Sequence, residues 1–204
     1  MGCRPVPKPA SRTRVDPIAR FARWFRAVER TRMPLPEATA LATAGRRGVP
    51  SVRFVLLKGA DARGFVFFTN AASAKGRDLR SNPRAALAFH WHPLGRQVRI
   101  AGRVEEVSPA EADAYWARRP RASQLAAVAS RQSATLTSRA ALIARWQRLR
   151  RRHRGTPVPR PAGWTGFRVV PRSIEFWTHA QHRLHHRELF VHTRRGWRRV
   201  LLQP

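Results

Sequence analysis

Five short apolar runs between residues 39 and 107 constrain the fold of this chain more than any other feature. They are rich in Val, Phe, Ala and Thr, and turn-forming segments such as Gly45-Arg46-Arg47-Gly48 separate them. Runs of this length bounded by turns are typical of β-strands. Their close spacing predicts an antiparallel meander that closes into a barrel. The five expected strands are residues 39–44, 51–58, 65–70, 85–91 and 97–107.

Helix-start signals place helices before, between and after these strands. Asp16 is a capping side chain followed by Pro17 at the first helical position, and Ser108-Pro109-Ala110-Glu111 is a capping box. The first helix is expected to end near Thr31, and the helix after Ser108 near Arg119. The other expected helices are residues 74–80, 123–129 and 138–153.

The C-terminal part of the chain returns to short strands. The expected strands are residues 167–170, 174–178, 189–193 and 197–202, and Arg194-Arg195-Gly196 joins the last two as a hairpin. We therefore expect one α+β domain over residues 16–204, a mainly antiparallel barrel with flanking helices. Residues 1–15 contain closely spaced prolines and no apolar signal-peptide core, and we expect them to form a flexible N-terminal arm.

The chain is unusually basic. It has 41 Lys and Arg against 11 Asp and Glu, which gives a formal net charge of +30. A polyanionic partner would explain this excess, and so would a GC-rich genome that favours Arg codons. The helix at residues 139–154 has the same two interpretations, a nucleic-acid or membrane surface, or the solvated face of a helix docked by Leu142, Trp146 and Leu149. We favour the second in both cases, so nucleic acid is not an expected partner.

Several classes of protein are excluded by what the sequence lacks. No stretch approaches the roughly 18 consecutive apolar residues of a membrane span, so no membrane crossing is expected. The single cysteine, Cys3, cannot form an internal disulfide, which fits the reducing cytoplasm. Walker, GxGxxG and GxSxG motifs are missing, and carboxylates are scarce. Any chemistry is therefore expected to use a cofactor or cationic groups.

Some short segments place cations beside hydroxyl or amide groups, a mixture that suits phosphate oxygens. Each is a weak signal by itself in a chain so rich in Arg. The segments are Arg53 with Lys58, residues 69–75, Arg96-Gln97, residues 119–123, and Arg131-Gln132-Ser133.

Residues 182–187 form a denser cationic patch, with three His and two Arg in six residues. His182 with His185 or His186 could chelate a metal, but no nearby carboxylate or thiolate completes a ligand set. No metal is therefore expected, and a site for an anionic ring or phosphate ligand is the simpler interpretation.

Taken in order, these motifs resemble the pyridoxine/pyridoxamine 5′-phosphate oxidase family. The resemblance extends from about Asp16 to the C-terminus, and so many motifs in fixed order are specific even though each is short. It implies an FMN-binding split β-barrel that forms a homodimer with two sites at the subunit interface. The matching stretches are residues 53–58, 67–70 with Ser73 and Lys75, 82–83, 96–98, Tyr115, 119–121, 123–124, 130–133, 174–177, and 182–185 with Arg187.

The resemblance assigns these residues to three groups. The substrate phosphate would be held by Lys58, Tyr115, Arg119 and Ser123. Arg183 and His185 would lie against the pyridine ring as the catalytic pair, with Arg183 over the face opposite the flavin. FMN would be held by Arg53, Phe68, Thr69, Lys75, Gln97, Gln132, Ser133, Trp177 and Arg187.

The activity that the resemblance implies is oxidation of pyridoxine or pyridoxamine 5′-phosphate to pyridoxal 5′-phosphate, with O₂ as electron acceptor and H₂O₂ as product. Two alternatives stay open. One is a related FMN oxidase acting on another ring, as in phenazine biosynthesis, and the other is a non-catalytic flavin or pyridoxal-phosphate binding protein. The complete substrate-phosphate set favours the first activity, because an unphosphorylated ring would not need it.

The chain also departs from the family pattern. Ala74 stands where many relatives have an Arg, which removes one expected contact to the FMN phosphate, and Arg77, one helical turn later, is the candidate replacement. His186 stands in place of the usual Asp after the Arg-Leu-His triplet. These departures bear on substrate identity and turnover rather than on the fold.

Overall fold

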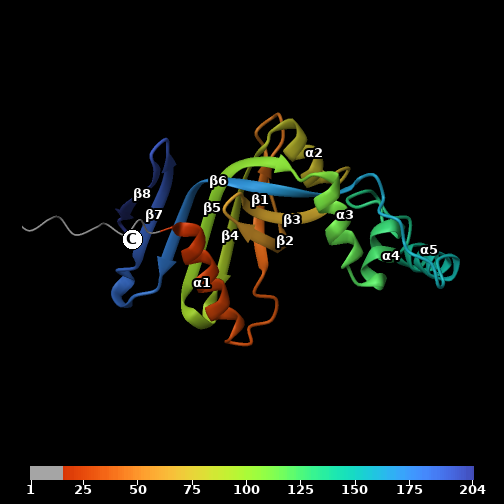
Figure 1. Cartoon of the computed structure of the whole chain (residues 1–204), viewed down its shortest axis with the longest axis horizontal. Helices are drawn as coiled ribbons and strands as arrows, with labels where there is room; N and C mark the ends of the chain where they lie inside the picture. The colour runs from red at the N-terminus through yellow and green to blue at the C-terminus, as the bar shows by residue number, and fades with distance from the viewer. Residues whose placement is uncertain (1–15) are drawn as a thin grey trace, which may run out of the picture.

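The structure is a computed structural model that describes residues 16–204, and an antiparallel β-barrel lies at its centre (Figure 1). Six strands close the barrel because β3 pairs with both β2 and β6, and two more strands extend the sheet beyond β6. The predicted flexible arm, residues 1–15, lies outside the described residues. The strands are β1 Ala38–Ala44, β2 Pro50–Asp61, β3 Gly64–Asn70, β4 Arg84–Trp91, β5 Arg96–Glu106, β6 Trp164–Thr178, β7 His186–Thr193 and β8 Gly196–Leu202.

The predicted barrel with flanking helices is confirmed, but the meander order is wrong. The strands follow the order β3-β2-β1-β4-β5-β6-β7-β8, so β1 lies between β2 and β4. The chain leaves β3 through helix α2 (Ala74–Ser81) and returns on the far side of β1. The first four residues of β3 are all buried, because Phe65 and Phe67 belong to the barrel core and Val66 packs against Val107 and Ala112 on the other face. Pairing β3 with β6 closes the barrel.

The two strands predicted at 167–170 and 174–178 are one continuous strand, β6. Pro171 and Arg172 do not form a turn. Instead, the register with β5 shifts between Ala101 and Gly102, so that β6 carries an extra residue at this point. Such a bulge tolerates a proline, which has no N–H to donate to the ladder. Gly102 allows the close approach, since a Cβ there would lie 2.0 Å from the Val170 carbonyl oxygen.

Helix α1 (Pro17–Glu29) fills one side of the barrel core. The Asp16 carboxylate caps it by accepting a hydrogen bond from the Ile18 N–H at 2.9 Å. Phe21 on its inner face is 1% exposed, and its ring meets Phe65 edge-on at 4.9 Å and Phe89 at 5.2 Å between centroids. Aromatic pairs of this geometry anchor the helix against the sheet.

Three further helices extend from the opposite end of the barrel: α3 (Pro109–Ala117), α4 (Arg121–Ala129) and α5 (Arg139–Arg152) (Figure 1). They share a smaller core of Trp116, Leu125, Val158 and Trp164. Two short 3₁₀ turns, His92–Leu94 and Gln181–Arg183, complete the regular structure. Within residues 16–204, no helix has both the length and the apolar character needed to cross a bilayer.

The predicted capping box at the start of α3 is confirmed. The Ser108 hydroxyl accepts from the Glu111 N–H at 3.1 Å, and the Glu111 carboxylate accepts from the Ser108 N–H at 3.4 Å. We expect Ser108→Ala to lower the free energy of unfolding by about 1 kcal/mol, because it leaves a helix N–H without its acceptor. Ser108→Asn, an equally good cap, is the control in urea denaturation. Equal stability of the Ala and Asn variants would contradict the prediction.

Candidate functional site

A cavity of about 210 Å³ lies where the ends of β2 and β3 meet α2 and α3. It brings together three of the four residues that the resemblance assigned to the substrate phosphate and four of the nine that it assigned to FMN. The lining includes three apolar residues of β2, Phe54, Val55 and Leu56. The predicted site residues that line it are Lys58, Phe68, Thr69, Lys75, Tyr115, Arg119 and Gln132.

Lys75 is a buried cation with neutral partners. Lys75 is the second residue of α2, two positions after the capping residue Ser73, and it is 7% exposed. Its ammonium group lies 3.0 Å from the Thr69 hydroxyl, 3.3 Å from the Ser73 hydroxyl and 3.2 Å from Gln132 Oε1. Burial, and next the charge of Arg53, lower the pKa of Lys75. No carboxylate among residues 16–204 forms an ion pair with Lys75, so its charge is left for an anionic ligand.

Arg53 lies beside Lys75 and is held by residues that the sequence did not single out. Its guanidinium donates to the Thr43 hydroxyl at 2.5 Å and to the Ser51 hydroxyl at 2.7 Å, and lies 3.6 Å from the Asp78 carboxylate. Asp78 also accepts from Thr43 at 2.7 Å. Asp78 is the single acidic residue of the basic helix α2 and lies one helical turn after Lys75. This position was the sequence signal that could have identified it.

Arg119 is the second cation of the cavity that lacks its full set of partners. Its Nε is buried and finds no hydrogen-bond partner in the described part of the chain, and burial lowers the pKa of its guanidinium. The guanidinium lies 5.3 Å from the centroid of the Trp164 ring, another residue the sequence did not indicate. An unpartnered buried donor of this kind is costly unless a ligand accepts from it.

The other three residues predicted to hold the substrate phosphate differ in their contacts and in whether they line the cavity. Tyr115 stacks on Phe68 with ring centroids 4.0 Å apart, and Phe68 stacks in turn on Trp164. Lys58 lies 3.4 Å from the Glu37 carboxylate, which no local pattern had indicated. Ser123 does not line the cavity, and its backbone carbonyl accepts from Arg119 at 3.5 Å.

The segment after α4 supplies Gln132 and Ser133. Gln132 Oε1 accepts from the Thr69 hydroxyl at 2.8 Å as well as from Lys75. Ser133 is exposed and has a φ of 70°, a left-handed conformation that is uncommon outside glycine. Arg77 donates to the Ala72 carbonyl at 2.6 Å, so its guanidinium folds back to the start of α2, near Ala74.

The remaining predicted residues form a second cluster around the 3₁₀ turn before β7. A cavity of about 620 Å³ here is lined by Trp177, Arg183 and His185 together with His179 and residues 180–182. The His185 ring lies 4.5 Å from the Trp177 ring, and its Nδ1 accepts from the Ala180 N–H at 3.2 Å. Burial, then the charges of His179 and Arg183, lower the pKa of His185.

The backbone of this turn is strained, because His182 and Arg183 have φ values of 55° and 61°. Consecutive left-handed residues without glycine are typical of functional turns. Trp177 pairs with Gln97 on one side and with Arg187 on the other. In the described part of the chain, no group of three His, Cys, Asp or Glu is placed to hold a metal ion.

Arg187 is oriented by Glu175, whose side chain is 8% exposed. The Glu175 carboxylate accepts from Arg187 Nε at 2.8 Å and from Arg99 at 3.1 Å. Glu175 belongs to the motif at residues 174–177 and lies two positions before Trp177, so both side chains are expected on the same face of the strand. That spacing was the sequence signal that could have identified it.

The two clusters lie at opposite ends of β6. Thr165 of β6 pairs with Thr69 in the first cluster, and Trp177 pairs with Gln97 in the second. The strand between Thr165 and Trp177 corresponds to about 40 Å of extended chain. No hydrogen bond or ion pair connects the two clusters within residues 16–204.

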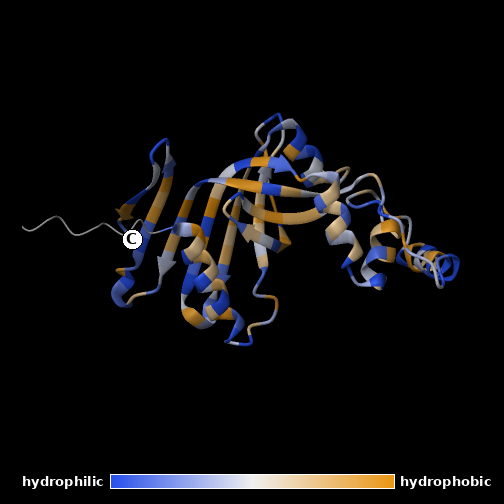
Figure 2. Ribbon diagram, in the orientation of Figure 1, coloured by the Kyte–Doolittle hydropathy of each residue, from blue (hydrophilic) through white to orange (hydrophobic). Residues whose placement is uncertain are grey.

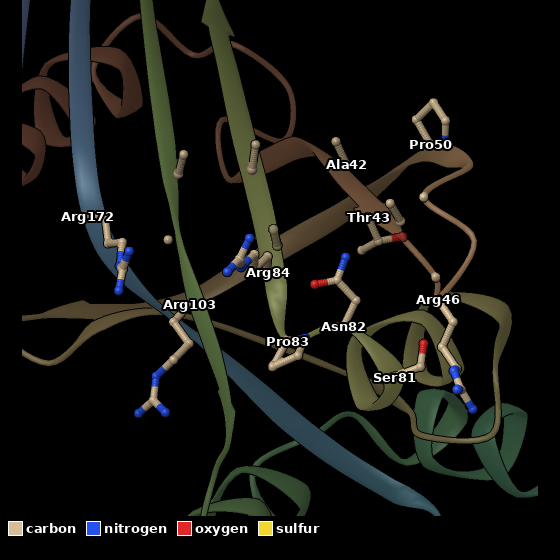
Figure 3. Close-up of a pocket in the computed structure, with 17 residues that line it drawn as sticks. Ala42, Thr43, Arg46, Pro50, Ser81, Asn82, Pro83, Arg84, Arg103 and Arg172 are labelled. Atoms are coloured by element: carbon tan, nitrogen blue, oxygen red, sulfur yellow. The ribbon is translucent and has the colours of Figure 1, made fainter.

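A further cavity, of about 1010 Å³, contains none of the predicted site residues. It lies on the outer face of β1, β4 and β5, over a floor of small side chains such as Ala42 (Figure 3). Arg46, Arg84, Arg103 and Arg172 surround it. Its position makes it a surface of the sheet rather than part of either cluster.

Comparison with known proteins identifies the family. Residues 27–153 match the family model described as "Pyridoxamine 5′-phosphate oxidase", and residues 164–204 match "Pyridoxine 5′-phosphate oxidase C-terminal dimerisation region". A pyridoxine/pyridoxamine 5′-phosphate oxidase of Rubrobacter xylanophilus is 52% identical over 189 residues, covering 93% of this chain and 87% of that protein. The one from Gluconobacter oxydans is 49% identical, covering 94% and 96%.

Solved structures agree with this assignment. PhzG from Burkholderia lata, crystallised with tetrahydrophenazine-1-carboxylic acid, superposes with a TM-score of 0.90 at 33% identity and 95% coverage of both chains. An FMN-binding protein of Nostoc punctiforme has the same fold, with a TM-score of 0.74 at 16% identity, covering 93% of this chain and 99% of that one. The buried cations described above fit the phosphate of FMN. The chain is thus an FMN-binding split barrel and belongs to the pyridoxamine 5′-phosphate oxidase family.

Proposed function

We propose that this protein oxidises pyridoxine 5′-phosphate or pyridoxamine 5′-phosphate to pyridoxal 5′-phosphate in the cytoplasm, with O₂ as electron acceptor. The observation that carries the proposal is the cavity shared by Lys75 and Arg119. Lys75 has neutral partners and Arg119 has an unpartnered Nε, so each can take a phosphate. A cavity with two phosphate sites fits a phosphorylated cofactor beside a phosphorylated substrate.

The reaction balances without a strong acid or base. The alcohol substrate loses two electrons and two protons at C4′, and O₂ takes them up as H₂O₂; the amine substrate also consumes one water and releases ammonia. Bound FMN supplies the electron transfer. The residues of this chain bind and orient: Lys58, Tyr115 and Arg119 hold the substrate phosphate, while Arg183 and His185 lie against the ring.

We place each site between two subunits of a homodimer. The second cluster falls inside residues 164–204, the part matched by the dimerisation-region model. Because β6 separates Lys75 from Trp177 and Arg187 within one chain, a partner subunit is the natural source of the second cluster. The first cluster of one protomer and the second cluster of its partner would then enclose one FMN.

Oxidation of a phenazine precursor is the second candidate. The high structural similarity to PhzG, which was crystallised with a phenazine-type ligand, supports it. A ring without a phosphate gives no role to Lys58 and Arg119 together, whereas the phosphorylated pyridine uses both. For this reason we prefer the pyridoxine phosphate reaction.

The visible spectrum of the FMN-loaded protein tests the proposal. We expect anaerobic addition of pyridoxine 5′-phosphate to bleach the yellow flavin absorbance, and admission of air to restore it with formation of H₂O₂. Unphosphorylated pyridoxine at the same concentration is the control, and it should bleach far more slowly. A flavin that binds and stays yellow with the phosphorylated substrate, but bleaches with a dihydrophenazine carboxylate, would establish the second candidate instead.

A further inference from the structure

Helix α5 carries a cationic surface that the flavin site does not use. Figure 1 shows α5 at the end of the molecule opposite β7 and β8, and Figure 2 shows that its outer side is strongly hydrophilic. None of its residues is buried. The exposed arginines in and just after this helix are Arg139, Arg145, Arg148, Arg150, Arg151, Arg152 and Arg154.

Among residues 16–204, none of these arginines forms an ion pair with an acidic residue. The sequence contains no Asp or Glu between residues 114 and 174, so the surrounding helices cannot neutralise them. Asp113, the last acidic residue before α5 in the sequence, is paired with Arg160 at 2.6 Å. The neighbouring Arg121 donates to backbone carbonyls of His153 and Thr156 instead of an acid. The Arg150 guanidinium lies 5.7 Å from the centroid of the Trp146 ring, a contact that does not neutralise its charge. The charge of α5 is therefore available to an external anion.

The arrangement of these charges is specific enough to form a site. Gln147, Arg150, Arg151 and Arg154 follow one another at i, i+3, i+4 and i+7, and alone line a hollow of about 570 Å³. Like charges at i, i+4, such as Arg150 with Arg154, repel each other, although the helix dipole favours cations near this C-terminal end. A bound polyanion would remove the repulsion. Guanidinium groups also match phosphate oxygens in a bidentate geometry.

The apolar side of α5 distinguishes between two polyanionic surfaces. Trp146 and Leu149 pack against the smaller core, and the Trp146 indole N–H lies 3.4 Å from the Ala122 carbonyl oxygen. A helix that lies in a membrane interface needs a free, broad apolar face, and here that face is already docked on α4. A nucleic-acid backbone requires cations alone. The sequence favoured a merely solvated basic face, but the unpaired stripe changes that expectation. We infer that the Gln147–Arg150–Arg151–Arg154 stripe of α5 binds the phosphate backbone of nucleic acid without sequence preference.

Fluorescence anisotropy with a labelled, short, mixed-sequence DNA duplex tests this inference on the full-length FMN-loaded protein. The variant R150Q/R151Q/R154Q removes three cations from α5. The matched control R23Q/R26Q/R30Q removes two exposed arginines of α1 and the exposed arginine that caps its C-terminus, none of which forms an ion pair within residues 16–204. Each phosphate contact adds about 0.9 to the slope of log affinity against log salt, so the α5 variant should lose about 2.7 of that slope. Its affinity near ~0.1 M salt should fall by roughly a hundredfold, and that of the control far less.

A third variant separates charge from folding. R150K/R151K/R154K keeps the cations and should retain most of the binding, while all three variants should keep the wild-type helix content and FMN spectrum. Equal losses in the α5 and α1 variants would overturn the inference, because binding would then reflect the overall charge of the protein. Absence of duplex binding, or binding to phosphatidylserine vesicles in preference to the duplex, would also overturn it.

Discussion

Replacing Lys75 with Met is expected to weaken FMN binding by about a thousandfold and, at the same time, to stabilise the FMN-free protein. Removing one partner of a buried charge pair typically costs 2–5 kcal/mol of binding energy, and about 4 kcal/mol corresponds to a thousandfold in Kd. In the FMN-free protein the same ammonium is buried among neutral oxygens, so an apolar side chain of similar length removes a desolvation cost.

Titration with FMN and chemical denaturation of the FMN-free protein measure the two effects of Lys75→Met. Lys58→Met is the matched control, since Lys58 lines the same cavity but pairs with Glu37 and is assigned to the substrate. It should leave FMN affinity nearly unchanged. An FMN-free Lys75→Met protein that is less stable than wild type would show that Lys75 holds the fold together rather than the cofactor.

The lowered pKa of Lys75 also makes the stability difference between the FMN-free wild type and Lys75→Met depend on pH. At pH values above the folded-state pKa and below the unfolded-state pKa, the unfolded chain binds the proton and the folded chain does not. The stability of the FMN-free wild type therefore rises with pH across this window. Its deficit relative to Lys75→Met should shrink as the pH approaches 10.5, the ordinary value for lysine. A constant difference across that range would contradict this explanation.

The second large effect is expected from Lys58→Ala combined with Arg119→Ala. Each side chain would lose a charge-assisted hydrogen bond to the substrate phosphate, which typically contributes 1.5–3 kcal/mol. Together they should lower kcat/KM for pyridoxine 5′-phosphate by about a thousandfold. The loss of Lys58 also leaves the Glu37 carboxylate unpaired beside the cavity, where it would repel the phosphate.

Two controls define what this double variant shows. FMN affinity should stay at the wild-type level, and the slow reaction with unphosphorylated pyridoxine should change little, because neither involves the substrate phosphate. Arg118→Ala is the positional control, since Arg118 adjoins Arg119 but is exposed and does not line the cavity. An equal loss with Arg118→Ala, or an equal loss for unphosphorylated pyridoxine, would contradict the assigned roles.

Local sequence signals predicted most of the individual elements correctly. Asp16-Pro17 and the Ser108 capping box start α1 and α3, and the five apolar runs correspond to β1–β5. These signals depend on interactions between neighbours in the chain, such as a side chain that caps the N–H two or three residues later. The pairing of β3 with β6 joins residues about a hundred positions apart, and no local pattern specifies such a partner.

The same distinction applies to the site. Sequence alone indicated the residue types of the candidate site, the cations, hydroxyls and aromatic rings that suit phosphates and a ring, together with the family. Burial and pairing came from the tertiary structure: within residues 16–204, Lys75 is buried without a carboxylate, Arg119 keeps an unpartnered Nε over Trp164, and Glu37, Asp78 and Glu175 pair with the neighbouring cations. Burial and distance depend on strands and helices far apart in the chain, so the strength of each charge becomes defined when the barrel closes.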